Sequence, residues 1–358
     1  MGEVFAGRFE LLEPVAEGGM GSVWVVRDRR DDEVYAGKVL RQSDSASLLR
    51  FMREQSTRIS HDHVVTPLSW AGEDDRVLFT MPLVRGGSVA TLIGDHGALP
   101  ALWVRELLVQ LLTALDAVHA TGVVHRDVKP ANLLLHATGE ARPHLLLSDF
   151  GIAARVDAPR LTHASEVIGS PGYMAPEQLA GADPAVTQDV YAAGLVGLEM
   201  LTGVRPPRTR DAAAALVATE PGLQGLASLL LEAAQHESTA RPPTAAALRD
   251  RLLALDLSAA PHPSEPVVVL DQLEDVAPGP TRVRPRDTAE ETAEETAEET
   301  AEETARKTVA PPTDADAAHT GSVPSPAPAP VGPAVGPAVA LLVVAALCLV
   351  AAAWLVLA

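Results

Sequence analysis

Two short stretches of the chain bring together side chains that could transfer a phosphoryl group. The first stretch holds Asp127, Lys129 and Asn132, and the second places Asp149 seventeen residues after the asparagine. A carboxylate can accept the proton of an attacking hydroxyl, a lysine can neutralise phosphate charge, and Asn and Asp oxygens can bind a magnesium ion. These residue types at this spacing therefore predict a site for phosphoryl transfer.

The residues around this predicted site, His-Arg-Asp-Val-Lys-Pro-Ala-Asn and Ser-Asp-Phe-Gly, resemble the catalytic and metal-binding loops of protein kinases, specifically the Ser/Thr kinases of bacteria. The resemblance covers roughly residues 8–255. It implies an α+β bilobal kinase fold at residues 1–257, with a small lobe of β-sheet and one helix at about 1–84 and a larger helical lobe at about 85–257. ATP is expected in the cleft between the lobes.

The resemblance also assigns a role to each of these polar residues. It implies that Asp127 orients the substrate hydroxyl and accepts its proton, while Lys129 neutralises charge on the transferring group. Asn132 and Asp149 are the expected ligands of Mg²⁺, with Mn²⁺ as the alternative metal. Lys129 with a proline after it is similar to Ser/Thr-specific rather than Tyr-specific kinases.

A glycine-rich stretch between two predicted strands matches the phosphate-binding loop that the resemblance implies. Its residues are Val15, Ala16, Glu17, Gly18, Gly19, Met20, Gly21, Ser22 and Val23. Glycines let backbone N–H groups approach the phosphates closely. The family pattern has glycine where Ala16 stands. Because alanine can adopt the extended conformation expected there, we expect reduced loop flexibility rather than lost nucleotide binding.

The resemblance places the other nucleotide contacts in the next strands. Lys38 is expected to hold the α- and β-phosphates and to pair with Glu54 of a helix; the alternative for this pair is a surface salt bridge, worth about 0–1 kcal/mol. In the hinge, Met81 is expected to close the back of the adenine pocket. Pro82 can offer its carbonyl, and Val84 both its N–H and its carbonyl, to the adenine ring.

Arg126, beside the predicted catalytic aspartate, indicates control by phosphorylation. In the family such an arginine pairs with a phosphate on the activation loop, which here spans residues 152–174. Thr162 and Ser165 are the hydroxyls for which we expect autophosphorylation, and Ser170 is expected to line the substrate site. A phosphate adds about −1.5 to −2 charge and can order a loop through an arginine.

The periodicity of apolar residues indicates which elements position these residues. Two runs rich in Val, residues 23–26 and 34–40, predict strands, and residues 48–59 predict an amphipathic helix on the sheet. A long helix before the catalytic loop should bury one face, formed by Leu107, Leu108, Leu111, Leu112, Leu115 and Val118. Further helices are predicted at residues 189–201, 212–218, 226–234 and 244–255.

Composition limits the partners. The net charge of −19 is shared by residues 1–257 and residues 258–358, which are both acidic, and this argues against nucleic acid as the main partner, because phosphate backbones need clustered Lys and Arg. The single cysteine, Cys348, cannot form an internal disulfide, and this suits a reducing cytoplasm.

The C-terminal part differs in kind. Residues 258–337 are rich in Pro, Ala and acidic residues, include four Thr-Ala-Glu-Glu repeats, and are expected to form a disordered spacer. Residues 338–358 carry no charge and are long enough to cross a hydrocarbon core of about 30 Å as one transmembrane helix. A buried core helix is the alternative. We therefore expect a single-pass protein of the cell membrane with a cytoplasmic kinase domain.

The combined sequence features favour a Ser/Thr protein kinase that uses ATP to modify Ser or Thr hydroxyls of protein substrates. A homodimer on the membrane would allow one domain to phosphorylate another. The runner-up is a membrane-tethered pseudokinase that binds nucleotide or partners without turnover, and Ala16 is the one departure that favours it. A small-molecule kinase is a third alternative, against which residues 169–177 resemble a platform for peptide substrates.

Overall fold

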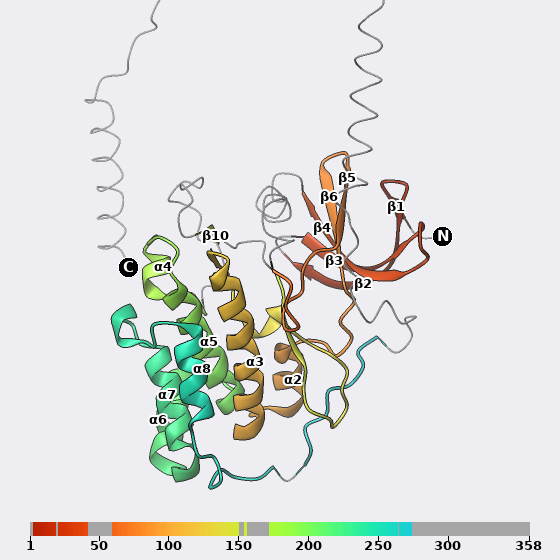
Figure 1. The fold of residues 1–358 in the computed structure, drawn as a ribbon. Coiled ribbons are helices and arrows are strands. Elements are labelled where there is room, and N and C mark those ends of the chain that lie inside the picture. Colours follow the sequence, from red (N-terminus) through yellow and green to blue (C-terminus); the bar gives the residue numbers. More distant parts are fainter. Residues whose placement is uncertain are drawn as a thin grey trace, which may run out of the picture. The chain divides into compact units, whose positions relative to one another are not determined.

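The N-terminal part of the chain forms a six-stranded antiparallel sheet in the computed structural model (Figure 1). The strand order is β1-β2-β3-β4-β6-β5, so β4 lies in the interior of the sheet. The strands are β1 (Val4–Phe5), β2 (Phe9–Gly18), β3 (Gly21–Asp28), β4 (Val34–Arg41), β5 (Ser69–Glu73) and β6 (Arg76–Met81). The two strands predicted from Val-rich runs correspond to β3 and β4.

The structure describes residues 3–18, 21–41, 59–149, 154–155, 172–263 and 265–273. All of them belong to one compact unit, Met1–Pro285. The helix predicted at residues 48–59 lies outside the described residues except for Ile59, which is buried.

Alternation along β4 gives the sheet two different faces. Residues 34, 36, 38 and 40 share one face, and Leu40 on that face joins the main hydrophobic core together with Phe79 of β6. The opposite face packs on Phe5 and Phe9 at the start of the chain. Lys38 therefore lies on the face that looks toward the helical part of the molecule.

The C-terminal part is helical (Figure 1). Its helices are α2 (Val89–His96), α3 (Ala101–Ala120), α4 (Pro176–Leu179), α5 (Val186–Thr202), α6 (Thr209–Thr219), α7 (Gln224–Ala233) and α8 (Ala245–Leu253). Helix α5 is buried along almost its whole length and packs against α3, α6 and α7. Two short antiparallel pairings complete the described part of this lobe: β7 (Val123–Val124) pairs with β10 (Ala154–Arg155), and β8 (Leu133–Leu135) pairs with β9 (Leu145–Leu147).

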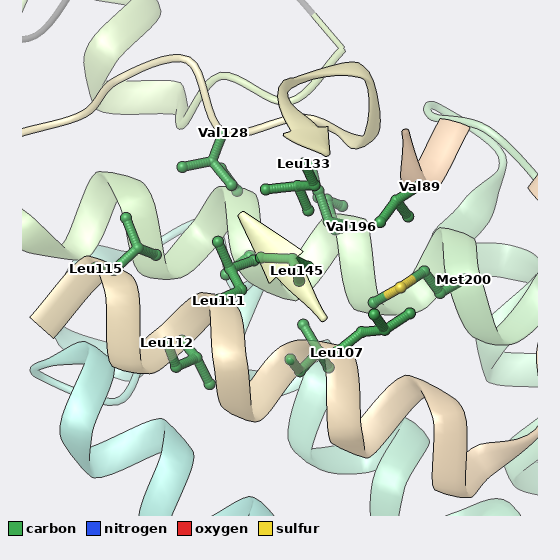
Figure 2. Close-up of a cluster of buried hydrophobic side chains, with 14 of the residues drawn as sticks. Val89, Leu107, Leu111, Leu112, Leu115, Val128, Leu133, Leu145, Val196 and Met200 are labelled. Carbon is green, nitrogen blue, oxygen red and sulfur yellow. The ribbon is translucent and has the colours of Figure 1, made fainter. Parts of the chain in front are cut away.

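The predicted long helix is confirmed as α3, and its leucines form the centre of the core. Figure 2 shows Leu107, Leu111 and Leu115 of α3 directed at residues of other elements, including Val128 and Leu133. Val128 directly precedes Lys129, and Leu133 directly follows Asn132. Their burial in the core therefore fixes the position of the catalytic loop. Burial of one leucine side chain contributes about 1.5–3 kcal/mol.

The other predicted helices are also present, with shifted ends. Helix α5 begins at Val186, three residues before the predicted start, and ends at Gly203, whose φ of +69° is left-handed and terminates the helix. A side chain at Gly203 would also collide with the backbone of Ala98. Helix α8 begins at Ala245, one residue after the predicted start at Thr244, and Thr244 caps it by accepting a hydrogen bond from the N–H of Ala247.

The chain beyond residue 257, assigned to the spacer from its composition, continues as packed structure to residue 273. Val267 and Val269 are 5% and 2% exposed, and both join the main core. The two buried valines contribute little to the average composition of residues 258–337. Composition alone therefore assigns this segment to the spacer. The rest of the spacer and the predicted span at residues 338–358 lie outside the described residues. Among the residues that the structure does describe, no helix is long and apolar enough to cross a membrane.

Candidate active site

Asp127 stands at the centre of a hydrogen-bonded cluster in the loop between β7 and β8. Its Oδ2 atom accepts hydrogen bonds from Nζ of Lys129 at 2.8 Å and from Nδ2 of Asn132 at 2.9 Å. Asn132 also donates to the backbone carbonyl of Asp127 at 2.8 Å. Because both amide hydrogens of Asn132 are used on Asp127, its amide oxygen is the atom left to bind a cation.

The backbone of the loop is held from behind by Asp189, in the first turn of α5. Its carboxylate accepts hydrogen bonds from the backbone N–H groups of His125 and Arg126, each at 2.8 Å, and from the ring of His119 at 2.8 Å. Burial alone would raise the pKa of Asp189, but these hydrogen bonds, with His119 contributing most, outweigh burial and hold the pKa below its usual range. The carboxylate is therefore ionised and locks the loop to the core.

His125 joins the loop to the segment after β9 that carries Asp149. The ring is completely buried, and burial lowers its pKa, so the imidazole is neutral. Its Nε2 atom bonds the carbonyl of Ser148 at 3.0 Å, while Nδ1 accepts from the backbone N–H of Asp127 at 3.3 Å. These partners assign the hydrogen to Nε2.

Asn132 and Asp149, the two predicted metal ligands, are held on adjoining segments. The backbone N–H and the hydroxyl of Ser148 both donate to the carbonyl of Asn132, at 2.9 and 3.0 Å. Asp149 follows with a left-handed φ of +68°, which is unusual for a residue with a side chain. Oxygen ligands from an amide and a carboxylate fit a hard divalent cation such as Mg²⁺. The described residues hold no group of three or more His, Cys, Asp or Glu that would form a metal site by themselves.

Lys38 reaches the same place from the sheet. Its Nζ atom lies 2.5 Å from Oδ1 of Asp149, and the Lys38 side chain is 15% exposed. The position of Lys38 on β4 is fixed by its pairing with Val23 of β3 and Phe79 of β6. The two partners are 111 positions apart in the sequence, so this ion pair joins the two parts of the molecule at the site. The expected partner Glu54 lies outside the described residues.

The glycine-rich stretch forms the hairpin between β2 and β3, and its tip residues Gly19 and Met20 lie outside the described residues. Gly18 pairs with Gly21, and Ala16 pairs with Val23. At Gly21 a Cβ atom would lie 2.2 Å from the carbonyl oxygen of Val39, so only glycine fits. Ala16 lies within β2 and, unlike Gly21, has no positive φ.

The predicted hinge follows β6. Met81 pairs with Ala36 of β4, and it lies half-buried with Pro82 and Val84 next to the sheet. Leu83, which lies between Pro82 and Val84, packs on Val25 and Val34 of the sheet. Sequence reasoning missed this apolar contact.

Arg126 has a left-handed backbone, with φ of +68°, and is held on both sides. Its N–H donates to Asp189, and its carbonyl accepts from the Gln178 side chain at 3.0 Å. Arg126 lines one small pocket with Tyr173 and Met174, which precede α4. Thr162, Ser165 and Ser170, the predicted phosphorylation and substrate residues, lie outside the described residues.

Two further pairs fix the segment after the activation loop. Arg241 donates to both carboxylate oxygens of Glu177, at 2.7 and 2.8 Å. Arg241 is 4% exposed, and its remaining donors reach backbone carbonyls. The hydroxyl of Tyr173 donates to Glu199 of α5, and burial raises the pKa of both groups. Sequence reasoning missed the second pair.

A search for related proteins gives a family for this arrangement. The model of the protein kinase domain matches residues 9–264. The chain belongs to the protein kinase family. The serine/threonine-protein kinase PkaA of Streptomyces coelicolor is 38% identical over 216 residues, which are 56% of this chain and 39% of that protein. The serine/threonine-protein kinase PknA of Mycobacterium tuberculosis is 36% identical over 216 residues, covering 58% and 49% of the two chains.

The kinase domain is therefore the part that these proteins share. A third relative, the probable serine/threonine-protein kinase PknB of Lactococcus lactis, is 32% identical over 213 residues, which are 58% of this chain and 33% of that protein. The chain spans less than half the length of each of these three relatives. Membership in the protein kinase family, with a sheet lobe and a helical lobe, is confirmed.

The buried pair of Glu177 and Arg241 should make stability depend on pH. In Glu177→Gln, Arg241 keeps its buried charge without a counter-charge, and we expect the free energy of unfolding at pH 7 to fall by about 3 kcal/mol. Burial raises the pKa of Glu177, but Arg241 outweighs burial and lowers the pKa below its ordinary value of 4.5. The stabilisation is therefore full above that value and is lost as the pH falls through the lower pKa of the folded state.

Urea unfolding at pH 7 and at lower pH measures this effect. The difference between wild type and Glu177→Gln should narrow below pH 4.5, because protonated Glu177 resembles glutamine. Glu237→Gln, a nearby exposed glutamate, is the matched control and should follow wild type throughout. A difference that stays constant across this pH range would contradict the assignment.

Proposed function

We propose that this protein is a Ser/Thr protein kinase that transfers the γ-phosphate of ATP to Ser or Thr hydroxyls of protein substrates. The observation that carries the proposal is the cluster in which Lys129 and Asn132 both bind the carboxylate of Asp127, next to the pair of Lys38 and Asp149. The names of the three relatives, two serine/threonine-protein kinases and one probable serine/threonine-protein kinase, support the same activity.

In this proposal Asp127 acts on the substrate hydroxyl. Asn132 and Lys129 orient its carboxylate, which would accept a hydrogen bond from the hydroxyl and then its proton. Lys129 lies 2.8 Å from that carboxylate, which supports a role in which its positive charge would neutralise the transferring phosphoryl group. The chemistry is therefore mainly positioning and charge neutralisation.

Lys38, Asn132 and Asp149 serve the nucleotide side. Lys38 would bind the α- and β-phosphates, and the oxygens of Asn132 and Asp149 would hold Mg²⁺, with Mn²⁺ as the alternative. A bound divalent ion neutralises phosphate charge. The ion pair of Lys38 and Asp149, with 2.5 Å between Nζ and Oδ1, supports roles for both residues at one site.

Replacing the proposed base tests the function. Asp127→Asn keeps the size of the side chain but cannot accept the hydroxyl proton, and we expect phosphate transfer to a generic protein substrate to fall by about 10²–10⁴-fold. Incorporation of labelled phosphate from Mg-ATP measures the rate. Asp95→Asn, at an exposed position on α2, is the matched control and should keep full activity. Equal activity of Asp127→Asn and wild type would remove Asp127 as the base, and an inactive wild type that binds ATP would favour the pseudokinase.

Control by autophosphorylation is part of the proposal and is supported by Arg126. Asp189 and Gln178 fix the backbone of Arg126, and its side chain lines the pocket next to Tyr173. A phosphate on Thr162 or Ser165 would pair with the guanidinium of Arg126, and this ion pair would order the loop.

Incubation with Mg-ATP should therefore place phosphate between residues 152 and 174. Peptide mass spectrometry is expected to find it on Thr162 or Ser165, and the double variant Thr162→Ala/Ser165→Ala should lose both the phosphate and most of the activity. Asp127→Asn supplies the control, since it should show no phosphate. A wild-type protein with full activity and no phosphate in this range would refute the hypothesis.

Attachment to the cell membrane is proposed from the sequence of residues 338–358. Their length and lack of charge support a single-pass helix, and the need for ATP supports a cytoplasmic kinase domain. Deleting residues 338–358 should move the protein from the membrane fraction to the soluble fraction of fractionated cells. A chain of equal length that lacks residues 310–330 instead should stay with the membrane. Persistent membrane association of the first variant would rule out this anchor.

A further inference from the structure

Residues 265–273 run from the helical lobe across the hinge to the sheet lobe. We propose that this segment, here called the strap, is a second connection between the lobes that positions the hinge and the nucleotide-facing side of the sheet for ATP. The inference rests on the proposed nucleotide binding and adds Asp271 and Leu273 as positioning residues.

The start of the strap is fixed to the helical lobe. Val269 and Gly139, in the loop between β8 and β9, exchange two backbone hydrogen bonds of 2.9 and 3.0 Å. Val267 and Val269 are buried in the core of this lobe, and the ring of His96 contacts the carbonyl of Val268 at 3.3 Å. This end of the strap therefore moves with the helical lobe.

The middle of the strap binds Arg85, the residue directly after the hinge at residues 82–84. The guanidinium of Arg85 donates to Asp271 at 2.8 Å and to the carbonyl of Leu273. The backbone carbonyl of Arg85 accepts a hydrogen bond from the N–H of Gln272 at 2.7 Å. Asp271 in turn accepts from the N–H of Leu273 at 2.8 Å. Burial would raise the pKa of Asp271, but Arg85 outweighs it and lowers the pKa, which agrees with an ionised partner.

The end of the strap reaches the sheet lobe. Leu273 packs against Val25 of β3 and Val34 of β4, the same buried pair on which Leu83 of the hinge packs. By alternation along β4, Val34 lies on the same face of the sheet as Lys38, the face that looks into the nucleotide cleft. Leu273 therefore braces the hinge against the side of the sheet on which the nucleotide would bind.

A connection of this kind affects affinity through the fraction of molecules with the hinge correctly placed. If removal of the Leu273 side chain leaves only about one molecule in five with the binding geometry, the apparent affinity for nucleotide falls about five-fold, or about 1 kcal/mol at 1.4 kcal/mol per tenfold. Asp127, Lys129 and Asn132 lie in the helical lobe, and the hydrogen bonds described for the strap run to Gly139, His96 and Arg85 instead, so the rate of the bound complex should change little.

Calorimetric titration of the full chain with Mg-ADP tests the strap. Leu273→Ala should weaken binding about five-fold and raise the KM for ATP in parallel, with kcat nearly unchanged. Leu270→Ala is the matched control, because Leu270 lies in the same segment but is 58% exposed, and it should bind as wild type does. Leu273→Met, which keeps the apolar volume, should restore affinity.

A second variant keeps the test decisive if Leu273→Ala unfolds. Asp271→Asn removes one charge from the pair with Arg85 and should also weaken binding of Mg-ADP. Variants that bind as tightly as Leu270→Ala, even with a lower melting temperature, would overturn the inference, since the strap would then only add stability. A wild-type chain that fails to bind Mg-ADP would overturn the proposed function itself, which separates the two failures.

Discussion

The catalytic geometry depends on one buried carboxylate, Asp189. Burying a carboxylate without partners costs several kcal/mol of desolvation free energy. Asp189 is tolerated because two backbone N–H groups of the catalytic loop and the ring of His119 donate to it. The dependence is mutual, since the left-handed backbone of Arg126 costs about 1–3 kcal/mol and persists because Asp189 and Gln178 hold it. The loop that carries Asp127 is therefore set by α5 rather than by its own sequence.

The two sides of the site are built with different rigidity. Asp127 and Asn132 lie on a loop, and the residue that follows each of them, Val128 and Leu133, packs into the leucine core of α3. Lys38, by contrast, comes from a sheet whose connections to the rest of the molecule include the hinge, the ion pair with Asp149 and the strap. Substitutions in the core of the helical lobe should act on the whole fold, whereas substitutions at these connections should act mainly on the nucleotide.

Sequence reasoning found the residues whose types carry the chemistry and the helices whose apolar period is regular. The leucines of α3 repeat at helical spacing, so their buried face could be predicted, and the spacing of Asp127, Lys129 and Asn132 is local. Pairs formed between distant segments could not be predicted in this way. His119 and Asp189 are 70 positions apart, and Arg85 and Asp271 are 186 positions apart, so only the folded chain reveals them. The strap was missed because its buried valines stand in a polar, proline-rich context.

The departure of this chain from the kinase pattern at Ala16 can be weighed on the same terms. Glycine is required where a Cβ would collide or where φ is positive, and Gly21 meets both conditions, with φ of +138°. Ala16 meets neither in its place within β2, opposite Val23. Its methyl group restricts the loop without forbidding the extended backbone that the hairpin needs. Because Lys38, Asp127, Asn132 and Asp149 all keep oxygen or ammonium groups suited to phosphoryl transfer, a single methyl group on the hairpin is a weak argument for a pseudokinase.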